Sequence, residues 1–600
     1  MSSPPLHLKL RGKSGLLVTC FLAALALLLL VYHALNLHSA HDSSRTLLDI
    51  FKLEDFSLKP PRIAAAEPPP AESPPAKSPP DETRPAESAP AESPPAKSRA
   101  AEFLPAVSLV VLKRTFAALS SFQRKSRLPL ANVATFNFGP SVTNTYAHYK
   151  LFSLPVPHVP ESLTWRDAYP VWVNESRSSC PKIPEPNDPD WLTIIDAIVA
   201  HVPCEEPRDS WARDVRWLQH LLAIAGFVIR AHRPWLPVVL LSPCRPPPNL
   251  FHCSRLVRRE GDVWLYNLTA NGMLTRVQPL GSCAMAQPIN PAAPAPHRVA
   301  YATVLHSSER YVCGAIVLGH SIRRTGSTAE MVVLVSKEIT EESRRGLREA
   351  GWRVKEIERI RNPNALNGTY NEWNYSKLRL WQQAEYARLV FVDSDLLLLT
   401  SVDFLFAFPE ISARGNDGSD FNSGVMVLEP SDCMFQLLMK NLRRVRSANG
   451  GDQGYLNNVF TWWHRLPESI NTLKPTWTTD PVKRQAILAL KNRWFSEDPS
   501  EIHAIHYLGL KPWVCYRDFD CNVLHPTLHN FANEAAHKRW WSVHDSMPES
   551  LQLFCMLTSH AKKEIKRRMK RSKEFNASRQ LWDGKFNDPR RTLTGMKSGA

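Results

Sequence analysis

The sequence lacks the cysteine spacing of a structural zinc site. None of its 11 cysteines stands in a Cys-x-x-Cys pair, whereas zinc ribbons and fingers need closely spaced thiolates. Zinc-finger spacing and RNA-binding signatures are also absent, although the formal net charge is +16 and such a charge favours acidic partners. We therefore expect no nucleic-acid partner. Anionic polysaccharide, anionic lipid and charged sugar nucleotides are the classes that remain.

A convincing signal-peptidase site is missing after the first hydrophobic run. Residues 1–14 are polar and basic, and the run from Leu16 to Tyr32 carries no charge, which is long enough to span a bilayer with help from its flanks. The competing interpretation is a cleaved signal peptide, but His38 interrupts the small-x-small pattern that ends at Ala40. We predict a cytoplasmic tail over 1–14 and a transmembrane signal anchor over 15–35, with the rest of the chain in a lumen.

Residues 36–128 lack the composition needed to bury a core. The segment from Pro60 to Pro95 is rich in Pro, Ala, Glu, Ser and Lys, and the unit Ala-Glu-Ser-Pro-Pro-Ala-Lys-Ser occurs at 71–78 and again at 91–98. Such composition favours extended polyproline conformations over a packed fold. We predict a disordered Pro-rich stem that holds a folded head away from the membrane.

Apolar residues return in 129–296, which we predict to be an accessory lumenal region. A helix is expected over 211–229, and strands are expected over 237–241 and 263–266. Disulfides are permitted in a lumen, but the sequence leaves open how the cysteines of this region pair: Cys180, Cys204, Cys244, Cys253 and Cys283. Glycosylation sequons, which fit a secretory compartment, occur at Asn174, Asn267, Asn367, Asn374 and Asn576.

From 297 onward, strand patterns alternate with helix patterns. We expect strands at 301–305, 331–335, 353–357 and 390–392, and helices at 310–324, 341–349 and 377–388. This alternation predicts an α/β unit over 297–545 with a mostly parallel sheet. Ligands of such sheets bind beyond the carboxyl ends of the strands. Residues 546–600 are predicted to be a basic C-terminal tail, with a solvated helix face at 561–573.

Two carboxylates, Asp393 and Asp395, directly follow the apolar strand Val390–Val392. One interpretation is a turn with two solvated aspartates, since Asp favours turns. The other is a divalent metal that holds the phosphates of a substrate, because carboxylate oxygens suit Mg²⁺ or Mn²⁺. The position at the carboxyl end of a strand favours the metal.

A series of motifs further along the chain resembles the retaining glycosyltransferases of family 8, to which glycogenin belongs. The motifs are Tyr311-x-x-Gly314-Ala315, Lys377, Asp393-Ser394-Asp395, Asn422-Ser423-Gly424, Gly451-Asp452-Gln453-Gly454 and His506-x-x-Gly509-x-Lys511-Pro512-Trp513. Other stretches resemble the plant glucuronoxylan glucuronosyltransferases in particular, and these lie at 301–308, 375–381, 462–467 and 513–522. One departure from glycogenin-like members is that His506 and Lys511 stand one residue closer, a spacing that looks like the xylan subgroup.

The resemblance implies a GT-A-type nucleotide-sugar-binding domain that uses a UDP-sugar and Mn²⁺. By position, Asp393, Asp395 and His506 would be the metal ligands, and the metal would act as a Lewis acid toward the departing UDP. Lys511 would place a point charge at the same diphosphate. The other implied donor-site residues are Thr303, Val304, Leu305 and Tyr311 at the uracil, together with Ser394, Asn422, Ser423 and Gly424. Lys377, Asp452 and Gln453 would be catalytic residues between the donor sugar and the acceptor.

The function implied by the resemblance is transfer of glucuronic acid from UDP-glucuronate to the xylan backbone. The product would be an α-1,2 side chain of plant cell-wall glucuronoxylan, made by a single-pass type II protein of the Golgi membrane. Two alternatives are kept. One is a family 8 transferase with another donor, such as UDP-galacturonate or UDP-glucose. The other is a non-catalytic scaffold of a polysaccharide synthase complex.

Some residues also have plain structural interpretations. His506 alone would be an ordinary core histidine, but its neighbours in the motif favour a ligand, whereas His503 is expected to be structural. Trp462-Trp463 is expected in the core rather than as a platform for a sugar chain. Cys515 and Cys521 are candidates for a local disulfide beside the Lys511 turn.

The sequence leaves two routes open for the retaining step. A double displacement needs a nucleophile beneath the anomeric carbon. Asp452 is a carboxylate in that neighbourhood, although it also suits a helix start, and Gln453 is an amide and a poor nucleophile. The second route is a same-face attack that the leaving phosphate assists.

Overall fold

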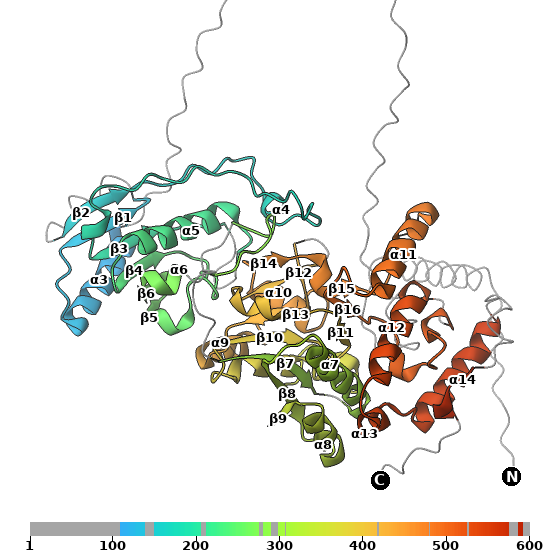
Figure 1. Ribbon diagram of the computed structural model, residues 1–600. Helices are drawn as coiled ribbons and strands as arrows, with labels where there is room; N and C mark the ends of the chain where they lie inside the picture. The colour runs from blue at the N-terminus through green and yellow to red at the C-terminus, as the bar shows by residue number, and fades with distance from the viewer. Residues whose placement is uncertain are drawn as a thin grey trace, which may run out of the picture.

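The computed structural model describes residues 109–591, apart from 139–148, 206–211, 275–279, 290–297, 307, 417–418, 479, 525–526 and 575–585. Two large sheets and one small sheet lie side by side with helices packed around them (Figure 1). The predicted anchor at 15–35 and the repeats of the stem lie outside the described residues. Among the helices that are described, none is both long and apolar enough to cross a membrane.

The N-terminal unit is a six-stranded sheet between two helices. Its strand order is β2-β1-β3-β4-β6-β5, parallel from β2 to β4 and antiparallel from β4 to β5. Successive residues of β3 face opposite sides, so that Ile198 packs toward α5 (Val215–Arg230) and Val199 toward α3 (Leu109–Ser126). The other elements are β1 (Asn132–Phe136), β2 (Lys150–Leu154), α4 (Trp165–Ala168), β3 (Ala197–His201), β4 (Leu236–Leu241), β5 (Leu256–Glu260), β6 (Val263–Leu268) and α6 (Ala270–Leu274).

Helix α3 corrects the predicted stem, which was drawn to residue 128. Leu112, Phe116 and Leu119 are buried against the sheet at helical spacing. The sequence prediction was wrong here because the proline-rich repeats ahead of α3 dominated the composition. The folded head therefore begins no later than residue 109.

The second unit is a seven-stranded sheet of order β14-β12-β13-β10-β7-β8-β9. Strands β10, β7, β8 and β9 run parallel, and β13 lies antiparallel between β10 and β12. The strands are β7 (Val299–Leu305), β8 (Glu330–Ser336), β9 (Arg353–Ile357), β10 (Arg388–Val392), β12 (Ser412–Gly415), β13 (Phe421–Leu428) and β14 (His464–Leu466). The α/β class and the mostly parallel sheet expected of a GT-A domain are confirmed.

Helices cover both faces of this sheet (Figure 1). α7 (Val312–Arg324) and α8 (Glu341–Glu349) pack on one face, and α9 (Asp432–Asn441) and α10 (Asp452–Val459) pack on the other. The predicted α-helix at 377–388 is wrong. The chain forms a 3-10 helix instead, η6 (Asn374–Gln382), and β10 already begins at Arg388. Tyr375, Leu378 and Trp381 are fully buried, and their spacing of three aligns them on one face of a 3-10 helix.

The accessory region is not a separate module, because one continuous hydrophobic core includes residues of both large sheets. The Asn249 amide donates to the carbonyl of Trp462 at 2.8 Å, and the Arg465 guanidinium donates to the carbonyl of Ser282 at 2.6 Å. A disulfide joins Cys253 to Cys433 across the same boundary. The N-terminal unit thus braces the β12–β14 edge of the second sheet.

A small third sheet and the C-terminal helices complete the second unit. β16 (Ala504–His506) lies between β11 (Leu396–Leu398) and β15 (Thr472–Leu473). The helices that follow are α11 (Pro481–Ser496), α12 (Glu534–Asp545), α13 (Glu549–Gln552) and α14 (Ser559–Glu574). Among the described residues, the disulfides are Cys180–Cys283, Cys204–Cys244, Cys253–Cys433, Cys313–Cys555 and Cys515–Cys521.

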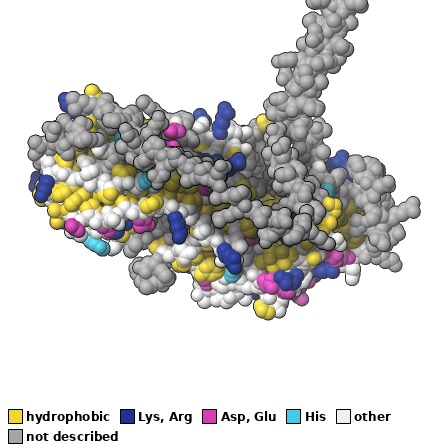
Figure 2. All heavy atoms as spheres, turned by 90° about the horizontal axis from the view of Figure 1, so that it is seen from above, with side chains coloured by type: hydrophobic (Ala, Val, Ile, Leu, Met, Phe, Trp, Pro, Cys, Tyr) yellow, Lys and Arg dark blue, Asp and Glu magenta, His cyan; other side chains and the backbone are white. Residues whose placement is uncertain are grey.

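The end of the chain is more than the basic tail predicted for 546–600. Cys555 is bonded to Cys313 of α7, Ile565 of α14 is buried, and Arg590 is buried with a relative exposure of 4%. The predicted solvated helix face is present on α14, where Lys563 and Lys566 are exposed. On the face shown in Figure 2, Lys and Arg side chains are scattered among hydrophobic and neutral ones rather than gathered in one field.

Candidate active site

The residues Asp393-Ser394-Asp395 form the Asp-x-Asp turn. This turn lies between the end of β10 and the start of β11, beside β13. β10 ends at Val392, and the amide of Asp393 donates to the carbonyl of Gly424 at 2.8 Å. The amide of Tyr507 donates to the carbonyl of Asp395 at 2.9 Å, and Leu396 pairs with His506 across β11 and β16. Backbone hydrogen bonds therefore bring the turn and His506 together, although a long stretch of chain separates them.

The three predicted metal ligands form one cluster. Asp393, Asp395 and His506 each offer a ligand atom, and these atoms lie within 4.8 Å of one another. His506 Nε2 is 3.3 Å from Asp395 Oδ1. Two carboxylates and an imidazole are a donor set that suits a divalent first-row metal. The residues present therefore fit a bound divalent cation.

Lys511 lies at the same turn. Its ammonium is 2.5 Å from Asp395 Oδ2 and donates to the carbonyl of Tyr507 at 2.9 Å. The chain reaches Lys511 through Gly509, whose φ of +88° is in the left-handed region that favours glycine. The Lys511 ammonium therefore stands beside the candidate metal ligands.

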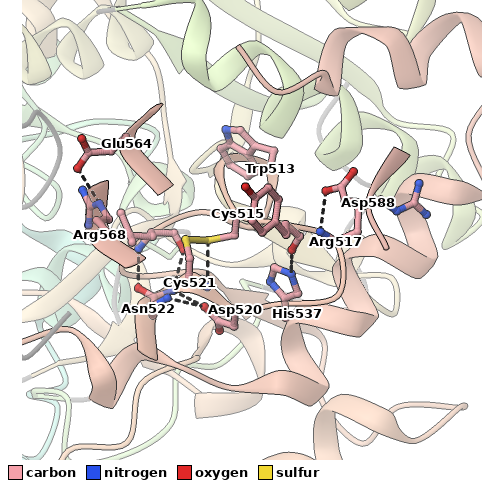
Figure 3. Close-up of a disulfide and its surroundings, with 12 residues drawn as sticks. Trp513, Cys515, Arg517, Asp520, Cys521, Asn522, His537, Glu564, Arg568 and Asp588 are labelled. Atoms are coloured by element: carbon pink, nitrogen blue, oxygen red, sulfur yellow. Dashed lines mark hydrogen bonds and ion pairs between the residues drawn. A yellow bond between two sulfur atoms is a disulfide. The ribbon is translucent and has the colours of Figure 1, made fainter. Parts of the chain in front are cut away.

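The turn that carries Lys511 is supported by hydrogen bonds around the Cys515–Cys521 disulfide (Figure 3). Asn522 accepts from the amide of Leu510 at 2.7 Å and donates to its carbonyl at 2.9 Å. The predicted pairing of Cys515 with Cys521 is confirmed. Three separate contacts thus fix the loop that carries the cation.

On the opposite side of the Asp-x-Asp turn, Lys377 binds two carboxylates. Its ammonium is 2.6 Å from Asp452 and 3.3 Å from Asp393. Ser423 Oγ donates to Asp452 at 3.1 Å, and the amide of Ser423 donates to Gln453 Oε1 at 3.2 Å. The three predicted catalytic residues, Lys377, Asp452 and Gln453, are therefore brought together with the Asn422-Ser423-Gly424 stretch.

The charged groups of the site shift one another's pKa values. Burial raises the pKa of Asp393 to about 6, with Asp395 acting in the same direction and Lys377 opposing it. Burial also acts to raise the pKa of Asp395, but Lys511 and His506 hold that pKa well below its usual value. For Lys377, burial acts to lower the pKa, and Asp393 and Asp452 outweigh it and raise the pKa above its ordinary value.

The residues predicted for the uracil lie beside this cluster. Thr303, Val304 and Leu305 form the carboxyl end of β7, which is the strand next to β10. Tyr311 precedes α7, and its ring stands edge-on to Trp513 with the ring centroids 6.1 Å apart. The Trp513 indole donates to the carbonyl of Arg310 at 2.8 Å. Residues that are 203 positions apart in the sequence therefore meet here.

Three polar residues at the site were not singled out from the sequence. His306 follows β7 directly, and burial, with Lys377 acting in the same direction, lowers its pKa to about 4. Asn374 donates to Asp452 at 3.2 Å, and Asn471 contacts His506 at 3.0 Å. His306 stands in the 301–308 stretch, which gave a signal, whereas no motif marked Asn471. Asn374 was noted only as a sequon, and its burial makes it inaccessible to a glycan in the folded protein.

The structure also decides between the alternative interpretations of Trp462-Trp463, His503 and Asp452. Trp462 and Trp463 are fully buried, so that they belong to the core and offer no sugar platform. His503 contacts the hydroxyl of Thr400 at 2.6 Å, as expected of a structural histidine. Asp452 is the first residue of α10, so that it stands at a helix start and also contacts Lys377.

Comparisons with known proteins agree on one family. A family model described as the GUX1-5 N-terminal domain matches residues 110–283. UDP-glucuronate:xylan alpha-glucuronosyltransferase 1 of Arabidopsis thaliana is 44% identical over 459 residues, which cover 74% of this chain and 68% of the relative. Putative UDP-glucuronate:xylan alpha-glucuronosyltransferase 3 of the same plant is 43% identical, covering 73% and 72%.

Solved structures similar to this chain include the galactosyltransferase LgtC in complex with donor and acceptor sugar analogues. That match has 16% identity and a TM-score of 0.27, and it covers 42% of this chain and 99% of the other. The family therefore rests on the sequence relatives. With more than 40% identity to two of them over nearly three quarters of its length, the chain belongs to the family of the UDP-glucuronate:xylan alpha-glucuronosyltransferases.

Proposed function

We propose that this protein transfers glucuronic acid from UDP-glucuronate to the xylan backbone with retention of the α configuration. The observation that carries the proposal is the cluster of Asp393, Asp395, His506 and Lys511 in a chain of this family. Two carboxylates and an imidazole suit a divalent cation, and the adjacent ammonium suits a diphosphate. A UDP-sugar presents that diphosphate.

Asp393, Asp395 and His506 would hold the metal, for which we propose Mn²⁺. When bound, such a metal supplies Lewis-acid stabilisation of the charge that develops on the departing UDP. Lys511 adds a fixed positive charge at the same place, and the Gly509 turn and the Asn522 contacts keep it there. Because the site is buried, each charge acts through a low local dielectric and is worth more than in water.

Lys377 would orient Asp452 toward the donor sugar. The Asp452 carboxylate receives hydrogen bonds from Ser423 and Asn374 in addition to its ion pair with Lys377. With three hydrogen-bond donors on its oxygens, this carboxylate has few lone pairs left to attack the sugar, which makes it a weak nucleophile. This arrangement favours the same-face route, in which Asp452 and Gln453 position the reacting groups without forming a covalent bond to the sugar.

The cellular setting is part of the proposal. A signal anchor at 15–35 and a stem that ends near residue 108 would hold the head in the Golgi lumen as a single-pass type II protein. The five disulfides between described cysteines support an oxidising compartment. Membership of a larger synthase complex is compatible with this setting.

Two experiments separate the proposal from its alternatives. Calorimetry with UDP and Mn²⁺ distinguishes an enzyme from a scaffold, because a scaffold without a donor site should show no metal-dependent UDP binding. A screen of UDP-glucuronate, UDP-galacturonate and UDP-glucose on xylo-oligosaccharides tests the donor. We expect UDP binding that requires the metal and the highest transfer rate with UDP-glucuronate. Equal or faster transfer from another donor would contradict the assignment of the sugar.

A further inference from the structure

Asn471 is a fully buried amide with hydrogen bonds at both ends. It closes the short 3-10 helix η8 (Glu468–Asn471), just before β15. Its Oδ1 lies 3.0 Å from His506 Nδ1, and its Nδ2 donates to Asn422 Oδ1 at 2.9 Å. Its relative exposure is 0%. The side chains of Asn422, Asn471 and His506 therefore form a hydrogen-bonded chain, called the relay, and all three are buried.

A backbone amide sets the direction of this relay. The N–H of Gly424 donates to Asn422 Oδ1 at 2.9 Å, and a backbone N–H cannot accept. The Asn422 atom is thus its carbonyl oxygen, which can only accept. The atom of Asn471 that faces it must be the NH₂ group. The other end of Asn471 is then a carbonyl oxygen, and it must accept from His506 Nδ1–H.

The proton on Nδ1 leaves the other ring nitrogen with a lone pair. That nitrogen, His506 Nε2, is 3.3 Å from Asp395 Oδ1. We propose that Asn471 is a positioning residue that holds His506 in the tautomer with its proton on Nδ1, so that Nε2 faces the cation shared with Asp393 and Asp395. Histidine ligands generally depend on such a partner at the second nitrogen. The inference rests on the metal role proposed above.

The backbone around Asn471 is held in place from two sides. Leu473 pairs with His506 across β15 and β16, and the amide of Lys474 donates to the carbonyl of His506 at 3.0 Å. At the start of η8, the amide of Glu468 donates to Glu175 Oε1 of the N-terminal unit at 2.6 Å. The relay therefore has little freedom to rotate away from His506.

The test measures Mn²⁺ affinity directly, without turnover. The full-length chain is titrated with Mn²⁺, and free Mn²⁺ is followed by electron paramagnetic resonance in the absence of donor. Asn471→Leu removes the acceptor at nearly constant size. Asn471→Asp keeps an acceptor for Nδ1–H, and its buried carboxyl, protonated on the oxygen that faces Asn422, replaces the donor that the amide supplied. The matched control is Asn441→Leu, because Asn441 is also buried and hydrogen bonded, but on α9, to the carbonyl of Leu437.

We expect Asn471→Leu to weaken Mn²⁺ binding by about 10–100-fold, which is the usual loss when the partner of a histidine ligand is removed. Asn471→Asp should stay within a few-fold of the wild type, and Asn441→Leu should bind Mn²⁺ normally even if it unfolds at a lower temperature. If Asn471→Leu does not fold, Asn471→Ala carries the same expectation without added bulk.

Two results would overturn the relay alone. They are wild-type Mn²⁺ affinity in a folded Asn471→Leu protein, and an Asn471→Asp protein that binds as weakly as Asn471→Leu, which would indicate a structural role only. A wild-type protein that binds no Mn²⁺ would overturn the proposed metal site and the relay with it. The experiment thus separates failure of the relay from failure of the function on which it rests.

Discussion

Lys377 and Asp452 form an ion pair with an N–O distance of 2.6 Å, and the same ammonium lies 3.3 Å from Asp393. Lys377 comes from η6, Asp393 follows β10, and Asp452 begins α10. One cation therefore links three elements and stands between Asp393, a metal-ligand candidate, and Asp452, a predicted catalytic residue.

Replacing this cation should cost both stability and activity. We expect Lys377→Met to lower the free energy of unfolding by about 3 kcal/mol, because Asp393 and Asp452, two partly buried carboxylates, lose their common partner. Transfer should fall by about 100-fold or more, since Asp393 and Asp452 then repel each other. Chemical denaturation and initial rates measure the two effects. Lys538→Met is the control, because Lys538 pairs with Glu534 on the surface and should change stability by less than about 1 kcal/mol.

The metal assignment is tested by Asp395→Asn. The substitution removes a ligand oxygen's charge and the ion pair with Lys511. We predict that transfer falls by more than about 100-fold and that Mn²⁺ no longer raises the unfolding temperature. Asp432→Asn, on the exposed first turn of α9, should leave both quantities unchanged. Retained transfer in the Asp395→Asn protein would remove Asp395 from the site.

The C-terminal segment should affect donor binding from a distance. The Arg590 guanidinium donates to the carbonyl of Trp513 at 3.2 Å and to that of Cys515 at 2.7 Å, so that it supports the turn that carries Lys511. We predict that Arg590→Ala lowers the free energy of unfolding by about 2 kcal/mol and raises KM for the donor more than it lowers kcat. Steady-state kinetics at varied donor concentration provide the measurement.

Arg567→Ala is the matched control for that experiment. Arg567 is partly exposed and pairs with Glu564 on α14. Its loss should leave KM unchanged. If Arg590→Ala destabilises the protein but leaves KM for the donor at the wild-type value, the segment is structural and does not support the site.

Stability should also depend on pH through buried histidines. Burial lowers the pKa of His464 to about 3, whereas an unfolded histidine titrates near 6.5. The unfolded state therefore binds more protons between these values, and stability that is present above pH 6.5 is lost as the pH falls. His464 alone should contribute a loss on the order of 2 kcal/mol between pH 7.5 and 5.

The variant His464→Phe isolates this contribution, because the ring remains but cannot take a proton. Its free energy of unfolding should change less between pH 7.5 and 5 than that of the wild type, by roughly the amount given above. An unchanged difference between the two pH values would show that His464 does not titrate on unfolding in this range.

Much of the second unit follows from its sequence. The strand at 353–357 and the helix at 341–349 have the bounds that periodicity predicts. Each carries its pattern within a short window, and the pattern agrees with its packing. The stretch 377–388 was mistaken for an α-helix because Leu380, Ala384 and Ala387 stand at α-helical spacing, whereas η6 ends at Gln382 and Ala384 lies in a turn.

The parts that could not be predicted depend on contacts between distant segments. Asn471 and His506 meet only because β15 and β16 pair, and no local pattern encodes that pairing. The same holds for Cys313 and Cys555, whose bond brings the C-terminal segment onto α7. For α3, the helical signal is present in the sequence, but the proline-rich neighbourhood masked it.

The central claim is that this chain transfers glucuronic acid to xylan. Its most direct test incubates the full-length protein with UDP-glucuronate, Mn²⁺ and xylo-oligosaccharides, and then reads the anomeric configuration of the product by nuclear magnetic resonance. We predict an oligosaccharide that carries an α-linked glucuronosyl residue, and none when Mn²⁺ is replaced by a chelator. A folded protein that binds Mn²⁺ and UDP but forms no glucuronosyl product, or forms a β-linked one, would contradict the account.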